Sequence, residues 1–281
     1  MIQYFLGEID RNNECYNRGE CKAKISIYLS TPIVAIDNEK NVEGKMKARL
    51  STALGAHFDC DKVIVTIPLS LLKQNKIKFS GDFCLPEEKK AAIEKINMFS
   101  GMKAHILLRK GVDVRSSHIF ETTDLYFCPD KLFSQVWLNR NKETIFLTGF
   151  VVAETRDGLL SKDKDTVCDL FLHQLCEMFK DEEGSSLFLH SNPTCSAFDL
   201  YDWSADPFVG GMYSSPSIGA GWRINNDSGN KVIQTCRHDI KKAIVETIFF
   251  AGEHTNVKTC ATTQAAMESG VIAATDLLES F

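Results

Sequence analysis

The sequence predicts a mixed α/β fold with more than one sheet. Three observations carry this prediction. Residues 63–67 form a continuous β-branched run, three strand-like stretches follow one another between residues 103 and 152, and residues 262–278 have the pattern of a long helix. The length of 281 residues allows one large domain or two medium ones, with enough chain to bury a substantial core.

Eight stretches have the apolar pattern of strands. They are Ile25–Leu29, Ile33–Ile36, Lys45–Leu50, Val63–Ile67, Lys103–Arg109, Phe133–Leu138, Ile145–Val152 and Thr247–Ala251. The run that ends at Pro68 is apolar throughout, which is typical of a strand buried on both faces. The three stretches between residues 103 and 152 indicate a mixed sheet separate from the first one.

Three helices are expected. They are Pro86–Met98, Asp165–Phe179 and Thr262–Leu278, and the polar residues 181–195 and 224–240 are expected to be loops. In the last helix Ala266, Gly270 and Ala274 fall on one face. Glycine within a helix costs about 1 kcal/mol relative to alanine, so something is expected to pack close to the backbone at Gly270. Close packing on a strand and a helix start aimed at a ligand explain it equally well.

Composition excludes several classes of protein. A net charge of −5 argues against general nucleic-acid binding, and no apolar run approaches the ~20 residues that span a bilayer. The N-terminus turns acidic after six residues and does not have the pattern of a signal peptide, so a cytoplasmic, peroxisomal or nuclear location is expected.

The 10 cysteines include no CxxC pair and are interpreted as free thiols. No HExxH motif is present, so no metal site is expected.

Four segments, in order along the chain, resemble the flavin-containing amine oxidase family, which includes polyamine oxidases, monoamine oxidases and flavin-dependent histone demethylases. The segments are Asp61–Lys73 with its proline turn, Ser100-Gly-Met-Lys103, Trp203–Tyr213, and Ile248–Thr255 followed by Ala261–Gly270. The resemblance covers about residues 25–281. It implies a partial FAD-binding Rossmann-like domain interleaved with a mixed-sheet substrate-binding domain. The implied segments are 1–24, which match poorly, 25–80 and 201–281 for the FAD-binding domain, and 81–200 for the substrate-binding domain.

The same resemblance implies which residues contact FAD. The backbone at Gly252 and the carboxylate of Glu253 would meet the diphosphate and ribityl chain, since a carboxylate can accept hydrogen bonds from hydroxyls. Thr262 and Thr263 would lie near the flavin ring at a helix N-terminus, and Thr262 would also border the substrate. Ile33 matches the position whose main chain holds the adenine.

Lys103 matches the lysine that contacts flavin N5 through a water. Strand alternation alone favours a solvated face for Lys103, whereas the Ser-Gly-Met-Lys context favours the catalytic role. Tyr213 matches an aromatic wall of the substrate cage, where a ring face attracts a cationic amine; the alternative is a core tyrosine. Trp203 is expected to be structural or to border the substrate.

Two departures from the family pattern matter. Met212 follows Gly210-Gly211, where monoamine oxidases have the cysteine that binds FAD covalently, so any FAD is expected to be non-covalent. The GxGxxG turn that opens the family fold is missing. The nearest run is Gly219-Ala-Gly221, with Ile224 at the third glycine position. The resemblance therefore implies a chain that begins inside the family fold.

Two functions follow. One is oxidation of an amine to an imine by FAD, with O2 reduced to H2O2. The other is a non-catalytic remnant or interaction module that cannot hold FAD alone. A small-molecule amine and O2 are the expected partners, and the Trp203–Tyr213 stretch favours a polyamine or a related secondary amine. Spacing cannot place the charged candidates for substrate contacts, which are Arg109, Arg140, Glu121 and Glu154.

We expect the 281-residue chain to bind FAD weakly or not at all. The diphosphate would lack both a glycine-rich turn and the helix dipole behind it. Titration with FAD, followed by quenching of flavin fluorescence, measures the affinity. A submicromolar dissociation constant for the isolated chain would contradict the expectation.

Overall fold

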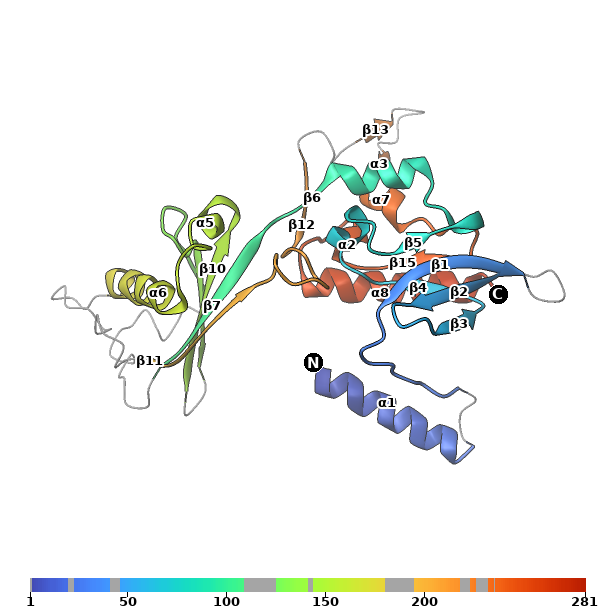
Figure 1. The fold of residues 1–281 in the computed structure, drawn as a ribbon, viewed down its shortest axis with the longest axis horizontal. Coiled ribbons are helices and arrows are strands. Elements are labelled where there is room, and N and C mark those ends of the chain that lie inside the picture. The colour runs from blue at the N-terminus through green and yellow to red at the C-terminus, as the bar shows by residue number, and fades with distance from the viewer. Residues whose placement is uncertain are drawn as a thin grey trace.

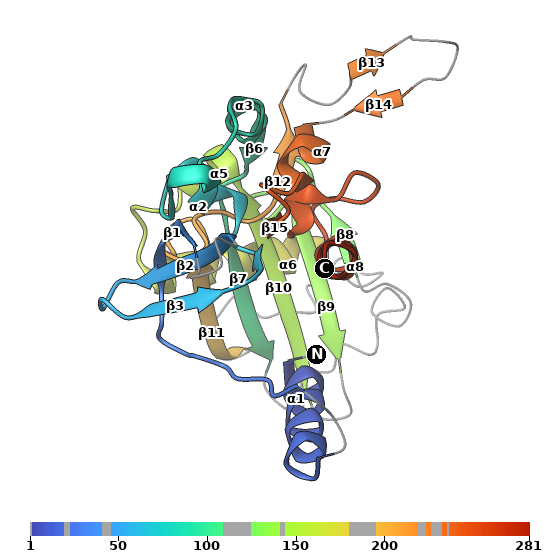
Figure 2. The same cartoon turned by 90° about the vertical axis from the view of Figure 1, so that its right-hand side faces the viewer.

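A computed structural model describes residues 2–19, 23–40, 46–108, 125–140, 144–179, 195–217, 223–225, 232–234 and 236–281. Two lobes, each with its own hydrophobic core, are joined through strands β6 (Ile96–Met98) and β12 (Ser214–Pro216), as Figure 1 shows. Helix α1 (Ile2–Asn17) lies below the first lobe in Figure 1 and at the bottom of the view in Figure 2. The fold is the mixed α/β arrangement that the sequence predicts.

The first lobe contains two small sheets. Strands β1 (Ile33–Lys40), β2 (Met46–Thr52), β3 (His57–Cys60) and β5 (Lys78–Phe79) form one sheet in the order β3-β2-β1-β5. Strands β4 (Val63–Val65) and β15 (Ile248–Phe250) pair in parallel and form the other. Apolar side chains of both sheets share one core, in which Ile36, Val65 and Phe250 are buried. The two halves of this lobe come from opposite ends of the chain.

Helices cover this core. They are α2 (Leu69–Lys73), α3 (Glu87–Lys95), α7 (Cys236–Lys241) and α8 (Thr263–Glu279), with short 3-10 turns at Gly81–Phe83 and Glu253–Thr255. The buried Lys89 of α3 ties α7 in place, because its ammonium donates to the carbonyl oxygens of Asp239, Ile240 and Lys242 at the end of α7. Burial lowers the pKa of Lys89 to about 7.

The second lobe is a five-stranded antiparallel sheet covered on one face. Strands β7 (Gly101–Leu108), β8 (Leu125–Phe127), β9 (Gln135–Arg140), β10 (Ile145–Val152) and β11 (Cys195–Asp202) lie in the order β11-β7-β10-β9-β8. Helix α6 (Lys164–Met178) packs its apolar stripe on the sheet, and the short α5 (Ala153–Asp157) follows β10. The rings of Phe133 and Phe171 pack directly against the backbone of Gly149, where an added Cβ would lie only 2.6 and 2.7 Å from them.

The two connections between the lobes run side by side. Strand β6 pairs with β12, and the pairing continues beyond both strands, because Phe99 exchanges backbone hydrogen bonds with Met212 and Tyr213 at 2.9 and 3.0 Å. The Gly101 amide then donates to the Ser204 hydroxyl at 2.8 Å. The chain leaves the first lobe and returns to it through one hydrogen-bonded ribbon, and this ribbon fixes the position of one lobe relative to the other.

Most predicted elements are present, and several expectations are wrong. Ile25–Leu29 is not a strand: it pairs with no strand among the described residues, and its side chains are exposed, Leu29 at 82%. Residues 224–240 are not all loop, because β13 (Arg223–Asn225) pairs with β14 (Val232–Gln234) and α7 follows. Helix α1 and strand β11 were not expected. Of the predicted loop 181–195, residues 181–194 lie outside the described residues, as do Gly219–Gly221.

The close protein neighbour expected at Gly270 is not found among the described residues. An added Cβ at Gly270 would meet none of their atoms within 4 Å, so close packing on a strand does not explain the glycine, and the ligand alternative stays a prediction. The buried residues of α8 are instead Ala265, Ser269 and Ala273, one position before each member of the predicted strip. Helix α8 therefore packs through a narrow stripe and leaves most of its surface exposed.

Candidate functional site

A cavity of about 630 Å³ lies where the two lobes meet. One wall is a face of the second-lobe sheet, another is the loop that returns to the first lobe, and the third is the start of α8 together with Glu253. The loop that returns to the first lobe, residues 203–213, begins next to Asp202. The Arg156 guanidinium holds Asp202 in place through a bidentate ion pair at 3.0 and 2.6 Å. The cavity thus gathers side chains from segments about 160 residues apart.

The sheet wall presents Lys103, Gln135, Trp137 and Phe150. In the register of β7, β10 and β9, Phe150 lies opposite both Lys103 and Gln135, so these three side chains lie in one row on one face. The Lys103 ammonium lies 5.9 Å from the ring centre of Trp137 and 5.8 Å from that of Phe150. Both distances are within the range of cation–π attraction, so the rings support a charged lysine at this wall.

The loop wall presents two further aromatic rings. Tyr213 stacks on Phe150 with ring centres 6.1 Å apart and also contacts Phe99 at 5.6 Å. Burial raises the pKa of the Tyr213 phenol, so the neutral ring is favoured. Trp203 packs against Tyr201 at 4.6 Å, and its indole nitrogen is buried without a hydrogen-bond partner in the part of the chain that the structure describes. A buried donor without a partner is uncommon.

The third wall is the N-terminus of α8. The Thr262 hydroxyl accepts a hydrogen bond from the Ala265 amide at 3.1 Å and caps the helix, and Thr263 is the first helical residue. Ala261, Thr262, Thr263 and Ala266 all border the cavity. The positive end of the helix dipole therefore points towards it, which favours negative charge at that wall.

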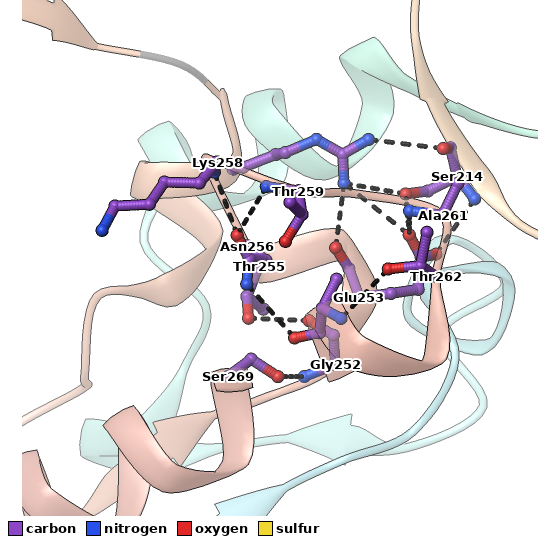
Figure 3. Close-up of polar contacts among 12 residues, drawn as sticks. Ser214, Gly252, Glu253, Thr255, Asn256, Lys258, Thr259, Ala261, Thr262 and Ser269 are labelled. Atoms are coloured by element: carbon purple, nitrogen blue, oxygen red, sulfur yellow. Dashed lines mark hydrogen bonds and ion pairs between the residues drawn. The ribbon is translucent and has the colours of Figure 1, made fainter. Parts of the chain in front are cut away.

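Glu253 makes several hydrogen bonds within the protein. One carboxylate oxygen accepts from the Ser214 amide at 3.0 Å, and the other accepts from the Ser214 hydroxyl at 2.7 Å and the Ala261 amide at 2.9 Å. Figure 3 shows these contacts converging on one carboxylate. A carboxylate offers about four acceptor positions, so one remains for a ligand hydroxyl. Its contact with a ribityl chain stays a prediction.

Gly252 lies beside this carboxylate but has both backbone polar groups engaged. Its amide donates to the Ser269 hydroxyl at 2.8 Å, and its carbonyl accepts from the Thr255 amide at 3.0 Å. An added Cβ would lie 2.4 Å from the His254 ring, and φ is +143°, so only glycine fits. Contacts within the protein are therefore enough to explain why this residue is a glycine, while its predicted contact with a diphosphate is untested.

Two predicted site residues, Ile33 and Gly252, do not line the cavity, and Ile33 lies in a different part of the first lobe. It borders a second, largely apolar groove of about 590 Å³ along β4, with Val34 and Val65 among its neighbours. Of the charged candidates, Arg109 and Glu121 lie outside the described residues, as does the side chain of Arg140. Glu154 is exposed on α5 and does not border the cavity.

Sequence reasoning did not identify Gln135, Trp137 or Phe150. Their signal was present in the alternation of two predicted strands, but the pairing of those strands with the Lys103 strand was not known.

No group of three or more His, Cys, Asp or Glu side chains that could hold a metal ion occurs in the described ranges. Within the same ranges, no helix has both the length and the apolar character needed to cross a membrane.

Comparison with known sequences gives a family match. The profile of the family described as flavin containing amine oxidoreductase matches residues 21–278. Lysine-specific histone demethylase 1 homolog 3 of Arabidopsis thaliana is 28% identical over 254 residues, which are 88% of this chain and 14% of that protein. Human lysine-specific histone demethylase 2 is 24% identical over 253 residues, 88% of this chain and 27% of that protein. The chain thus spans about a quarter or less of these two relatives.

Solved structures share the fold. A putrescine oxidase variant superposes with a TM-score of 0.67 at 15% identity, covering 90% of this chain and 49% of that one. Cyclohexylamine oxidase from Brevibacterium oxydans gives 0.65 at 13% identity, covering 88% and 48%. The chain spans about half the length of each of these oxidases.

The buried His254 predicts a loss of stability in acid. Burial, with smaller effects of Arg237 and Lys89, lowers the pKa of His254 to about 4. The unfolded state, with a pKa near 6.5, binds more protons between pH 4 and 6.5, so this contribution is present above pH 6.5 and falls as the pH falls towards 4. The full loss is about 3 kcal/mol.

Denaturant unfolding between pH 7 and 5 measures this effect, because most carboxylates stay ionised there. His254→Gln cannot titrate and should show a flatter dependence of unfolding free energy on pH. Equal slopes in the two proteins would rule out His254 as the source.

Proposed function

The chain belongs to the flavin containing amine oxidoreductase family, and on that premise we propose that it forms the substrate side of an amine oxidase that uses FAD. One observation supports the proposal above others. The Lys103 ammonium, the stacked rings of Tyr213 and Phe150 and the N-terminus of α8 border a single cavity. This combination suits an amine on the aromatic side and an electron-accepting ring on the helix side.

FAD is the cofactor that the family match indicates, and the cavity fits its flavin ring. A volume of about 630 Å³ lies within the usual range for ligand pockets. The Glu253 carboxylate keeps one acceptor position for a hydroxyl of the cofactor. When bound, FAD supplies the acceptor for two electrons and a hydrogen from the substrate C–H bond.

The remaining chemistry belongs to side chains of this chain. The faces of Tyr213 and Phe150 would attract and orient the amine. Lys103 would hold a water by its ammonium within the cavity. The amides at the start of α8, near Thr262 and Thr263, would stabilise negative charge at that wall. Water would then hydrolyse the imine, and reduction of O2 to H2O2 would complete the cycle.

A polyamine or a related secondary amine is the first substrate candidate, and the likeness of Trp203–Tyr213 to the polyamine oxidase and demethylase branch of the family supports it. A second candidate is a methylated lysine side chain, because several relatives are named lysine-specific histone demethylases. Aromatic walls suit an alkylated ammonium of either kind. Peroxide release with spermidine-type polyamines and with methyl-lysine peptides would separate them. A chain that shows no activity with any amine at excess FAD would favour a non-catalytic role. For either role we propose a cytoplasmic, peroxisomal or nuclear setting.

Lys103→Met and Tyr213→Ala should fail in different ways. With FAD in excess, loss of the Lys103 ammonium should slow flavin reduction or reoxidation with little change in amine binding. Loss of the Tyr213 ring should weaken amine binding by about 1–2 kcal/mol and also slow reduction as the C–H bond loses its alignment. Anaerobic stopped-flow reduction, followed by mixing with oxygen, separates these steps.

Two variants serve as controls for this pair. Tyr213→Phe keeps the ring and should keep most of the amine affinity, and Lys131→Met makes the same change at a surface lysine paired with Glu177. If Lys103→Met leaves both flavin half-reactions unchanged, the lysine has no catalytic role and acts as part of a solvated strand face.

Bound FAD should be released intact by acid or heat. Met212 stands where a linking cysteine would be needed, and a thioether cannot form that bond. After precipitation of the protein, the flavin fluorescence should remain in the supernatant. Fluorescence that stays with the precipitate would show a covalent bond at another residue and contradict this expectation.

A further inference from the structure

One carboxylate connects two walls of the cavity. Glu253 accepts a hydrogen bond from the amide of Ser214, the residue after Tyr213, and another from the amide of Ala261, the residue before Thr262. The two distances are 3.0 and 2.9 Å. The aromatic wall and the start of α8 are therefore each one residue away from an amide held by the same side chain. Figure 3 shows the contacts of Ser214 and Ala261 with Glu253.

Arg237 holds this carboxylate and Ser214 from the other side. Its side chain is 7% exposed, and one nitrogen donates to the Ser214 hydroxyl at 2.8 Å and to the Glu253 carbonyl at 3.3 Å. A second nitrogen donates to the Ser214 carbonyl at 3.3 Å. The guanidinium also lies 3.9 Å from the Glu253 carboxylate. A buried charge is tolerated only in such a paired arrangement, so the three residues constrain one another's positions.

The wall that Glu253 holds is the exposed start of α8, and other contacts attach this helix further along. The Gly252 amide donates to the Ser269 hydroxyl, and the Asn256 side-chain nitrogen donates to the Ala265 carbonyl and the Glu268 carboxylate. The loop before α8 is exposed at residues 257–264, and α8 buries only Ala265, Ser269 and Ala273. Asn256 organises the first part of this loop, because its side-chain oxygen accepts from the amides of Lys258 and Thr259. Among the described residues, Ala261 is tied to the rest of the cavity by the hydrogen bond from its amide to Glu253.

We propose that Arg237, Ser214 and Glu253 form a brace that sets the spacing between the Tyr213 ring and the N-terminus of α8. Arg237 and Ser214 are positioning residues that act through Glu253 and need no contact with substrate or cofactor. The brace gives Glu253 a role within the protein in addition to the ligand contact expected from the family resemblance. Its effect on amine oxidation rests on the proposed function, whereas its effect on the two walls does not.

Amide exchange in the 281-residue chain without cofactor tests the brace directly. Glu253→Ala should speed exchange of both the Ser214 and Ala261 amides by about tenfold each, the effect of losing one hydrogen bond. Glu253→Gln has one oxygen and an NH2 group, so it can satisfy one of the two amides and should free the other. Ser214→Ala keeps the backbone amide, so the Ser214 amide should remain protected while the carboxylate loses its hydroxyl partner.

A control variant lowers the stability of the protein at a site away from the cavity. Asp163 caps α6 on the far face of the second-lobe sheet, and its carboxylate accepts from the Thr166 amide at 2.8 Å. Asp163→Ala should destabilise the protein through loss of this cap while leaving exchange at Ser214 and Ala261 unchanged. Faster exchange at those two amides in Asp163→Ala, equal to that in Glu253→Ala, would mean that global opening explains both, and would overturn the brace.

Flavin reduction with FAD in excess gives the second readout. Arg237→Gln should lower the limiting rate of reduction by tenfold or more, with less than a threefold change in the amine concentration at half-saturation, because the amine still binds the rings but is misaligned. Arg237→Lys keeps the charge and should recover part of this rate. Equal rates in Arg237→Gln and the Asp163→Ala control would overturn the positioning role.

The two readouts separate the possible failures. If exchange responds as expected but the unsubstituted chain never reduces FAD with any amine tested, the proposed function fails and the brace stands. If reduction proceeds but Glu253→Ala leaves either amide protected, the brace fails and the proposed function stands.

Discussion

The structure depends on the paired ribbon that joins its two hydrophobic cores. Because β6 and β12 exchange hydrogen bonds, and Phe99 continues the pairing to Met212 and Tyr213, the two crossings cannot move independently. Each core is stabilised by its own apolar contacts, with α6 on one sheet and four helices around the others. The cavity lies beside the ribbon, where neither core supplies a complete wall. The ribbon therefore determines which side chains of the two lobes face each other.

Local patterns predicted the elements better than they predicted the site. Strand alternation predicts that Lys103 lies on the polar face of its strand, and its neighbours Ala104 and Ile106 are buried on the opposite face. Successive side chains of any strand point to opposite faces, so this prediction does not depend on knowing the partner strands. The row of Lys103, Phe150 and Gln135 depends on register across three strands, which spacing within one strand cannot give. The sequence therefore identified Phe150 only as an apolar residue of a predicted strand, whereas in the structure its ring stacks on that of Tyr213. The site residues named from the resemblance remain predictions as to their roles.

The errors have a common physical origin in contacts that are distant in sequence. Ile25–Leu29 has strand alternation but no strand to pair with among the described residues, and alternation alone does not satisfy a backbone. Helix α7 was missed because its segment is polar, yet Arg237 is buried there through its partners Ser214 and Glu253. Gly270 was expected to touch a neighbour, and the buried stripe of α8 lies one position away. In each case a tertiary contact, or its absence from the described residues, outweighed the local pattern.

The charges at the cavity bear on which form of an amine it would favour. Glu253 is the carboxylate at its border, and Ser214 and Ala261 take three of its roughly four acceptor positions, with Arg237 3.9 Å away. Lys103 contributes a positive charge that is held by ring faces. A positive charge nearby lowers the pKa of a bound amine, while the rings of Tyr213 and Phe150 still attract its carbon-bound hydrogens. An amine must be neutral at nitrogen to give up a hydride from the neighbouring carbon. The brace therefore has two effects on the proposed reaction: it fixes the walls, and the Arg237 charge beside the Glu253 carboxylate weakens the attraction of that carboxylate for a protonated amine.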